Sequence, residues 1–273
     1  MRLWVNGVLL DDPQAPAVSP VDHGITVGDG AFETLKVVDS VPFALTRHLD
    51  RLEASARGLG LPVPDRDLLR AGIAEVLAGW NQRFGRMRIT YTGGPSPIGS
   101  ERLTVDPTLL VALVELPARP PLTKLVTVPW VRNERGALTG LKTTSYAENV
   151  IALEYAHQRD GSEALFGNSA GMVCEGTGSN VFVVLDGHVL TPPLSSGCLA
   201  GVTRALVLEW FGGIEQDIPL EELGRAEEIF LTSTTRDVQA VAVLDDTQLA
   251  APGPFTVKAM EIFAARSARD LDP

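Results

Sequence analysis

Residues 141–156 read LKTTSYAENVIALEYA, and the two halves of this stretch predict different things. The second half predicts a helix, because Val150, Leu153 and Ala156 recur at the spacing that places them on one buried face. The first half places Lys142 before three small hydroxyl residues, where that helix is about to begin. A helix N-terminus carries partial positive charge, which disfavours a second positive charge beside it. Two interpretations of Lys142 follow: an ordinary surface lysine, or an amine that is used uncharged.

The composition excludes several classes of protein. The chain has 273 residues, with 34 Asp and Glu against 23 Lys and Arg, and no basic cluster stands out. Nucleic acid and anionic membrane surfaces are therefore not expected partners. The longest apolar runs, such as VFVVL at 181–185, are too short to span a bilayer, and the N-terminus lacks the features of a signal peptide. We expect a cytoplasmic protein of one large domain or two small ones.

The two cysteines give no sign of special chemistry. Cys174 and Cys198 match neither a metal-ligand spacing nor a disulfide framework. We expect both to be buried apolar thiols, and we predict no metal site.

The N-terminal part of the chain, residues 1–116, predicts a smaller α/β domain. Asn6-Gly7 between two apolar runs suits a type I′ turn, so a hairpin opens the chain. Thr46 is placed to cap a helix. The other elements predicted in this part are a strand at 32–38, helices at 46–60 and 67–78, and strands at 87–92 and 109–116.

A proline-rich segment follows. Residues 117–123, PARPPLT, continue neither a helix nor a central strand, so we interpret them as an interdomain linker. Residues 124–273 form the larger domain. Its predicted elements are strands at 124–131, 181–185, 188–192, 228–233 and 238–244, and helices after Lys142 and at 202–210 and 256–268. Strands outnumber crossover helices in both domains, which favours mixed sheets over a doubly wound parallel sheet.

Glu175 is a second candidate for chemistry. It ends an apolar strand in VCEGTGSNVFVV (173–184), and a Gly-Thr-Gly-Ser-Asn bend then leads into another buried strand. A carboxylate between two buried strands needs a partner. It is either an exposed turn glutamate or a carboxylate that holds a protonated nitrogen, such as a pyridinium.

Two further segments suit an anion. GCLAGVTRALVLEW (197–210) runs glycine-rich backbone into a helix with Thr203 in its first turn, which presents backbone N–H groups to a phosphate. FLTSTTRDV (230–238) runs a strand into hydroxyl residues whose turn amides suit phosphate or carboxylate. Each alone is also compatible with an ordinary loop. A Schiff-base lysine, a carboxylate for a pyridinium and two anion sites together are the groups that bind pyridoxal phosphate.

With these motifs the chain resembles the class IV aminotransferases, the fold-type IV group of pyridoxal-phosphate enzymes. The group includes branched-chain aminotransferases, D-amino acid aminotransferases and 4-amino-4-deoxychorismate lyases. The resemblance runs from DHGITVGDGAFETLKV near the start to FLTSTTRDVQAV near the end, and it depends on the order of the LK, ENV, EGTGSNVF, GVTR and FLT motifs. It implies an α/β fold of the α+β type, with two domains, mixed sheets and the cofactor between the domains. It also implies a homodimer.

The resemblance assigns roles to single residues. Lys142 matches the Schiff-base lysine, which also acts as the general base for the α-proton. Glu175 matches the partner of the pyridine nitrogen, and Arg51 matches the phosphate ligand. Further cofactor contacts fall on Ser179, Asn180, Val202, Thr203 and Thr234, and Thr235 falls on the turn that also meets the substrate carboxylate.

The resemblance leaves two reactions open. D-amino acid aminotransferases show an Arg-x-His pair after the strand that matches 87–92, whereas TGGPSPIGSER holds no histidine. Branched-chain enzymes are usually longer than this chain. We therefore expect 4-amino-4-deoxychorismate lyase, on the route to folate, ahead of an amino acid aminotransferase. A cofactor-binding protein without turnover is the non-enzyme alternative, and the intact Lys142, Glu175 and Arg51 argue against it.

The lyase substrate carries two carboxylates, so its pocket needs additional cations. The candidates are Arg88, Arg102, Arg132 and Arg135. We expect at least one arginine from 132–135 to reach the pocket, since that loop leads directly into Lys142.

Overall fold

The computed structural model describes residues 1–102 and 106–273, which form two compact units. Unit 1 comprises Met1–Pro117, Leu141–Tyr146 and Leu271–Pro273, and unit 2 comprises Ala118–Gly140 and Ala147–Asp270. The division differs from the predicted domains at two short segments, which return to unit 1 from later in the chain. One of these segments carries Lys142, so this lysine is a residue of unit 1. The division also differs at the predicted linker 117–123, whose last residues begin the strand Leu122–Arg132 of unit 2.

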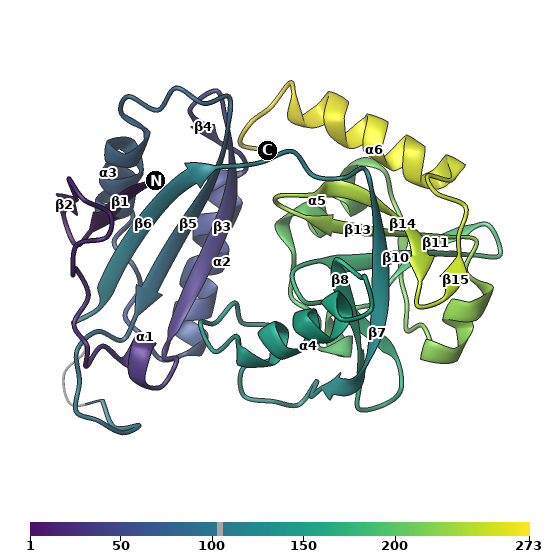
Figure 1. The fold of residues 1–273 in the computed structure, drawn as a ribbon, viewed down its shortest axis with the longest axis horizontal. Coiled ribbons are helices and arrows are strands. Elements are labelled where there is room, and N and C mark those ends of the chain that lie inside the picture. The colour runs from purple at the N-terminus through teal and green to yellow at the C-terminus, as the bar shows by residue number, and fades with distance from the viewer. Residues whose placement is uncertain (103–105) are drawn as a thin grey trace. The chain divides into compact units, whose positions relative to one another are not determined.

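Unit 1 is built on a six-stranded sheet in the order β2-β1-β6-β5-β3-β4 (Figure 1). Its elements are β1 (Arg2–Val5), β2 (Val8–Leu9), α1 (His23–Thr26), β3 (Gly30–Val38), β4 (Val41–Pro42), α2 (Leu45–Gly58), α3 (Arg66–Leu77), β5 (Phe84–Thr92) and β6 (Thr108–Glu115). Every strand pair in this sheet is antiparallel, so mixed pairing does not extend to unit 1. Helix α2 packs on β3, and α3 packs on β1 and β6, around a core centred on Trp4, Leu35 and Met87.

Two local predictions in unit 1 have opposite outcomes. The opening hairpin is confirmed, because Asn6 and Gly7 have φ of +44° and +95°, as a type I′ turn requires. The predicted helix cap at Thr46 is wrong. Ala44 occupies the N-cap position without a side-chain bond, and Asp272 instead accepts the Thr46 amide at 2.8 Å and the Thr46 hydroxyl at 2.7 Å. The capping oxygen comes from the far end of the chain, which no local pattern reveals.

Unit 2 is built on a nine-stranded sheet in the order β12-β11-β10-β13-β14-β7-β8-β9, with β15 paired to β14. Its strands are β7 (Leu122–Arg132), β8 (Glu163–Asn168), β9 (Val173–Gly176), β10 (Asn180–Leu185), β11 (His188–Thr191), β12 (Ile214–Glu215), β13 (Glu228–Ser233), β14 (Asp237–Leu244) and β15 (Thr247–Gln248). Parallel pairs join β7 to β8 and to β14, and antiparallel pairs join β13 to β10 and to β14. The predicted mixed sheet is therefore confirmed in this unit.

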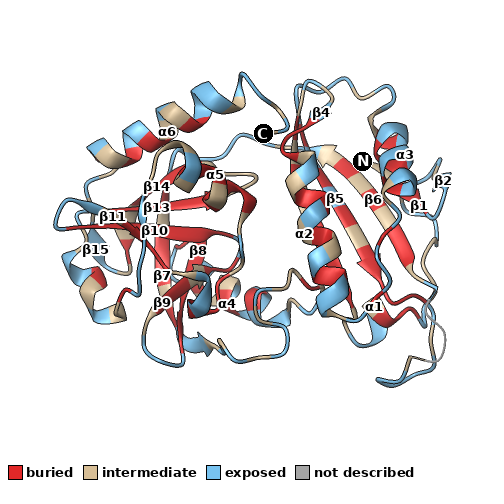
Figure 2. Cartoon of the chain, turned by 180° about the vertical axis from the view of Figure 1, so that it is seen from behind, coloured by how far each residue is buried: buried red, intermediate tan, exposed pale blue. Residues whose placement is uncertain are grey.

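Helices flank this sheet. They are α4 (Ala147–His157), α5 (Val202–Trp210) and α6 (Pro254–Ser267), with short 3-10 turns at Leu194–Ser196 and Leu220–Arg225. Figure 2 shows the strands β10, β13 and β14 buried along most of their length, whereas α6 has an exposed outer face. None of the described helices is long and apolar enough to cross a membrane.

Helix α4 is present, but its predicted buried face is only partly correct, because Ala156 is buried and Leu153 is half-buried whereas Val150 is not. Val150 is 63% exposed, and the buried residues are Asn149, Ala152 and Ala156. The apolar spacing misled because Asn149 is buried through a specific bond, from its amide nitrogen to the Thr177 carbonyl at 2.6 Å. The polar residue thus takes a place that the spacing gave to an apolar one.

The cysteines behave as expected. Cys174 and Cys198 are free and buried. Burial raises the pKa of both thiols, so they are poor nucleophiles at neutral pH.

Candidate active site

Lys142 is held on unit 1 by its own backbone. Its carbonyl accepts the Phe32 amide at 2.9 Å, and its amide donates to Ser55 Oγ at 3.1 Å, so β3 and α2 both fix it. The side-chain amine lies 4.3 Å from the centroid of the Phe32 ring and 6.0 Å from that of Tyr146. Contacts with a strand, and not a helix dipole, therefore place this amine, because α4 begins only at Ala147.

The hydroxyl residues after Lys142 have a structural task. Thr144 and Ser145 both donate their hydroxyls to the Gly28 carbonyl at 2.9 Å, and the Thr144 amide donates to the Gly30 carbonyl at 2.8 Å. A Cβ on Gly30 would lie 2.8 Å from the Tyr91 carbonyl oxygen, closer than side chains are tolerated. The hydroxyls thus dock the lysine segment on the glycine turn that precedes β3.

A buried carboxylate, Glu33, joins β3 to α2. It accepts Arg51 Nε at 2.8 Å, Arg51 Nη2 at 2.7 Å and His48 Nδ1 at 2.7 Å. Burial acts to raise the pKa of Glu33, but the charge and hydrogen bonds of Arg51 and the bond from His48 lower it to about 2. Burial lowers the pKa of His48, so its ring is neutral, with the proton on Nδ1 facing Glu33 and Nε2 left as an acceptor.

This arrangement bears on Arg51, the predicted phosphate ligand. Its side chain is 13% exposed, and Glu33 holds the guanidinium in a two-bond fork. A guanidinium has five N–H groups in one plane, so the fork fixes the direction in which the others point.

The predicted substrate arginines of unit 1 differ in what they contact. The Arg88 guanidinium carbon lies 3.8 Å from the centroid of the Phe32 ring, so Arg88 and Lys142 contact one aromatic ring. Arg102 instead forks onto Asp29, with Nε to Oδ2 at 2.6 Å, and donates Nη1 to the Leu59 carbonyl at 2.9 Å. Arg102 therefore ties its loop to the rest of unit 1.

In unit 2, Glu175 on β9 is partly buried between two kinds of partner. Its Oε2 accepts the Leu199 amide at 2.9 Å, and its Oε1 lies 3.6 Å from Arg132 Nε. Arg132 also bonds Glu148, and its guanidinium lies 4.1 Å from the centroid of the Phe166 ring. Glu175 is therefore a carboxylate with a cation beside it, and not an exposed turn glutamate.

These contacts bear on the expectation that at least one arginine from residues 132–135 reaches the substrate pocket. Two carboxylates, Glu148 and Glu175, engage Arg132, and Arg135 has an exposed side chain. The bond at Arg135 that fixes the loop is made by its backbone, which donates to Asn133 Oδ1 at 3.0 Å.

Residues 199–203 connect Glu175 to the start of α5. Asn180 Nδ2 donates to the Leu199 carbonyl at 2.9 Å, and a Cβ on Gly201 would collide with Asn180 Oδ1. Helix α5 has no side-chain cap, and the hydrogen bonds of the described chain include none from the Val202 or Thr203 amides. Amides of this kind are those that an anion binds at a helix N-terminus.

Ser179 and the turn of Thr234 and Thr235 complete the predicted set in unit 2. Ser179 is buried and donates its hydroxyl to Glu163 Oε2 at 3.2 Å. Thr234 and Thr235 are half-buried in the turn between β13 and β14. The turn is closed by the Arg236 amide, which donates to the Ser233 carbonyl at 3.1 Å.

The predicted residues thus gather within each unit, and four others organise them. Unit 1 brings Lys142 and Arg88 onto one aromatic ring, and unit 2 links Glu175, through Leu199, to Asn180 and α5. The organising residues that sequence reasoning missed are Glu33, His48, Glu163 and Arg236. For the two glutamates a signal existed, because Glu33 lies inside an apolar strand and Glu163 directly precedes an apolar run, and a charged residue at such a place requires a buried partner.

The predicted site residues lie within a region of the chain that matches a known protein family. A family model described as amino-transferase class IV matches residues 30–244, a range that holds Arg51, Lys142, Glu175 and Thr235. The chain belongs to the class IV aminotransferases. It is therefore a pyridoxal-phosphate-dependent enzyme of the transaminase or lyase type.

The proteins that this chain is similar to include both aminotransferases and a lyase. A putative branched-chain-amino-acid aminotransferase of Methanocaldococcus jannaschii is 31% identical over 90% of this chain and 88% of its own length. An aminodeoxychorismate lyase of Bacillus subtilis is 27% identical over 98% of this chain and 95% of its own length. D-alanine aminotransferases of Listeria also align along nearly the whole chain. Since the branched-chain relative is so nearly covered, chain length does not exclude that activity.

A solved structure shows the same fold. A hypothetical aminotransferase from Mycobacterium tuberculosis, in its pyridoxal-phosphate-bound form, matches with a TM-score of 0.88 and 26% identity, over 99% of this chain and 100% of that one. The class IV aminotransferase architecture predicted from the sequence is confirmed.

The residues of this chain fit the cofactor of the family. The amides at the start of α5 have the geometry for a phosphate, and Gly201 leaves that approach without a side chain. Thr232 Oγ1 is buried without a protein partner, in the strand pair where Thr232 faces Asn180. A buried hydroxyl of this kind is an available partner for a polar ligand.

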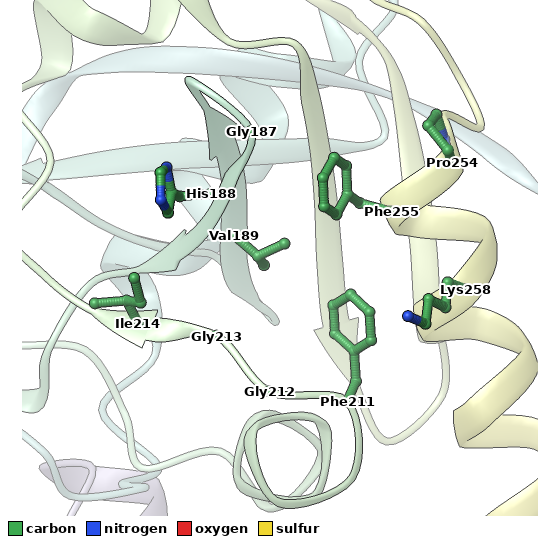
Figure 3. Close-up of a pocket in the computed structure, with 10 residues that line it drawn as sticks. All are labelled: Gly187, His188, Val189, Phe211, Gly212, Gly213, Ile214, Pro254, Phe255 and Lys258. Carbon is green, nitrogen blue, oxygen red and sulfur yellow. The ribbon is translucent and has the colours of Figure 1, made fainter.

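One pocket of unit 2 lies apart from all of these residues. It encloses about 460 Å³ between β11, the end of α5 and the start of α6 (Figure 3). Phe211, Phe255, Val189 and Ile214 give it a largely apolar lining. None of the predicted site residues lines it, so it has no part in the assignments below.

Proposed function

We propose that the protein is an amino acid aminotransferase in which Lys142 anchors pyridoxal phosphate and removes the proton at the substrate α-carbon. The proposal rests on one observation, the shared contact of Lys142 and Arg88 with the Phe32 ring. Catalysis on an amino acid needs a base for the α-proton and a cation for the carboxylate, and these two side chains supply them next to one ring. Thr235 is the second proposed carboxylate contact.

We assign the other predicted residues to the cofactor. When bound, pyridoxal phosphate supplies an electron sink for the pair of electrons that the α-proton leaves behind. With the cofactor bound, the Lys142 amine would take that proton from the α-carbon and could return it at a carbon of the cofactor, and this return is what distinguishes transamination. Glu175 would hold the pyridine nitrogen, and the supporting observation is the cation of Arg132 beside it. Phosphate contacts are assigned to Arg51, Val202, Thr203 and Thr234, and ring support to Ser179 and Asn180.

Arg51 is proposed to bind and not to react. We expect Arg51→Ala to weaken cofactor retention about tenfold or more, because a charge-assisted contact to phosphate is lost. Excess pyridoxal phosphate then restores most of the activity. Cofactor titration of the apo-protein measures this, with Arg57→Ala as control, an exposed arginine of the same helix that pairs with Glu53. Unchanged cofactor affinity in Arg51→Ala would remove the phosphate role.

The proposed amino transfer is tested with a panel of amino donors and keto-acid acceptors. We expect 2-oxoglutarate or pyruvate to be aminated by one or more of alanine, glutamate and the branched-chain amino acids. Both enantiomers of each donor are included, because TGGPSPIGSER lacks the Arg-x-His pair of the D-specific enzymes. Keto-acid formation from the donor is the readout, and absence of amino transfer from every donor contradicts the proposal.

The lyase remains a second candidate because of the similarity to the Bacillus subtilis lyase along nearly the whole chain. Its two-carboxylate substrate requires more cations than Arg88. Arg102 is bonded by both Asp29 and the Leu59 carbonyl, and Arg132 lies between Glu148 and Glu175, so each has partners on more than one side. For this reason we rank it below the aminotransferase, the reverse of the ranking from sequence alone. Release of 4-aminobenzoate and pyruvate from 4-amino-4-deoxychorismate without any keto-acid acceptor would reverse it again.

We also propose that the enzyme is a cytoplasmic homodimer. Unit 2 exposes large apolar side chains on β7 and α4, which are Trp130, Val131, Val150 and Ile151 at 42–63% exposure. Exposed apolar residues grouped on neighbouring elements are typical of an interface. A monomeric mass by light scattering would exclude the dimer.

A further inference from the structure

Glu163 is a buried carboxylate for which the proposed chemistry has no direct use. It begins β8, and its side chain is 2% exposed. Oε1 accepts the Thr177 amide at 2.9 Å and also the Thr177 hydroxyl. Oε2 accepts Ser179 Oγ at 3.2 Å and Arg236 Nη2 at 2.9 Å. A buried charge is stable only when it is fully paired, and Glu163 meets this condition with donors from two separate loops.

The first of these loops is the bend of residues 176–180, between β9 and β10. Thr177 and Ser179 are its hydroxyl residues, and both donate to Glu163. A carboxylate paired with a guanidinium only accepts hydrogen bonds, so each hydroxyl gives it its single proton. Ser179 Oγ is consequently left with lone pairs alone, and toward any other group it acts only as an acceptor.

The second loop is the turn of residues 233–236, between β13 and β14. Its Arg236 side chain is 8% exposed, and besides Glu163 it bonds Gln239 Oε1 and the Ser162 carbonyl. Gln239 in turn donates to the Pro120 carbonyl at 2.7 Å. Arg236 is therefore fixed on several sides, and the adjacent Thr234 and Thr235 are fixed with it.

We propose that Glu163 and Arg236 are positioning residues that hold the 176–180 bend and the 233–236 turn in register for the cofactor. The inference rests on the proposed function, because Ser179 and Thr234 are cofactor contacts only within it. Neither Glu163 nor Arg236 needs to touch the cofactor. Their ion pair sets the distance between a hydroxyl assigned to the ring and a hydroxyl assigned to the phosphate.

Glu163→Gln tests this most directly. Its amide nitrogen, in place of Oε2, would face the Arg236 guanidinium and Ser179, so the ion pair is lost and the Ser179 proton is no longer drawn inward. We expect the dissociation constant of pyridoxal phosphate, measured by titrating the apo-protein, to rise about tenfold, since misplacement of binding groups by a fraction of an ångström is costly. Arg236→Lys keeps the charge but loses the planar guanidinium that bonds Glu163, Gln239 and the Ser162 carbonyl together, and a smaller rise is expected.

A second buried carboxylate of unit 2 provides the control. Glu228 is 3% exposed and accepts the Phe255 amide at 3.0 Å, the Thr256 amide at 2.8 Å and the Thr256 hydroxyl at 2.7 Å at the start of α6. Glu228→Gln therefore removes a buried, multiply bonded carboxylate away from the predicted site residues. We expect both glutamine variants to lower the melting temperature of the apo-protein, and only Glu163→Gln to weaken cofactor binding.

The possible outcomes distinguish a failure of the positioning role from a failure of the proposed function. If wild type does not bind pyridoxal phosphate, the proposed function fails. If wild type binds it and Glu163→Gln binds it equally well, or no more weakly than Glu228→Gln, the positioning role is wrong and the proposed function stands. Should Glu163→Gln not fold, Arg236→Lys decides in the same way, and unchanged affinity there overturns the inference.

Discussion

Replacing Lys142 by alanine lowers turnover by about a thousandfold or more, because the variant has lost both the cofactor anchor and the base for the α-proton. The fold is expected to survive. Lys142 is tied to Phe32 and Ser55 through its backbone amide and carbonyl, which alanine keeps. Only the amine on the Phe32 ring is removed. The loss is therefore a loss of chemistry at constant structure.

The test measures the turnover rate with the preferred amino donor and the melting temperature of each variant. Lys36→Ala is the matched control, because Lys36 is in the same unit and its amine also lies over an aromatic ring, 5.5 Å from the Phe43 centroid. We expect the control to retain its activity and its visible cofactor absorbance. Wild-type turnover by Lys142→Ala would show that another group performs the chemistry and would end the assignment.

The sequence predicts elements well where the signal is local. Helix α5 spans Val202–Trp210 as predicted, and the type I′ hairpin forms at Asn6-Gly7. Both depend on neighbouring residues only, a glycine-to-helix transition and a turn pair. The cap of α2 depends on Asp272, which is 226 positions from Thr46, so the local pattern pointed to the wrong residue.

The candidate site shows the same division between features that sequence patterns predict and features that contacts between distant segments determine. Motif order places Lys142, Glu175 and Arg51 in the sequence, but their environments come from contacts between distant segments. Lys142 meets Phe32, and Glu175 meets Arg132, across gaps that no periodicity spans. The dipole argument for Lys142 failed for this reason, since its backbone pairs with β3 and the helix starts later.

Glu175→Gln has the second largest expected effect. The carboxylate keeps one oxygen on the Leu199 amide, and a glutamine oxygen can accept that same bond at 2.9 Å. Loop 199–203 and the α5 amides therefore stay in place, and we expect the cofactor to bind. What changes is charge, since a neutral amide no longer stabilises a protonated ring nitrogen, and its N–H groups face the Arg132 guanidinium.

We expect proton abstraction to slow about a hundredfold or more, the usual loss when one group that stabilises transition-state charge is removed. Exchange of the substrate α-proton with solvent deuterium measures that step alone, and absorbance reports the bound cofactor. Glu134→Gln is the control, because Glu134 is a carboxylate of unit 2 whose pKa is lowered by the Ser169 hydroxyl, and it has no assigned role. If exchange in Glu175→Gln matches wild type while cofactor remains bound, the carboxylate does not act on the ring. Its bond to Leu199 would then be its whole contribution, and Arg132 would serve only to satisfy it.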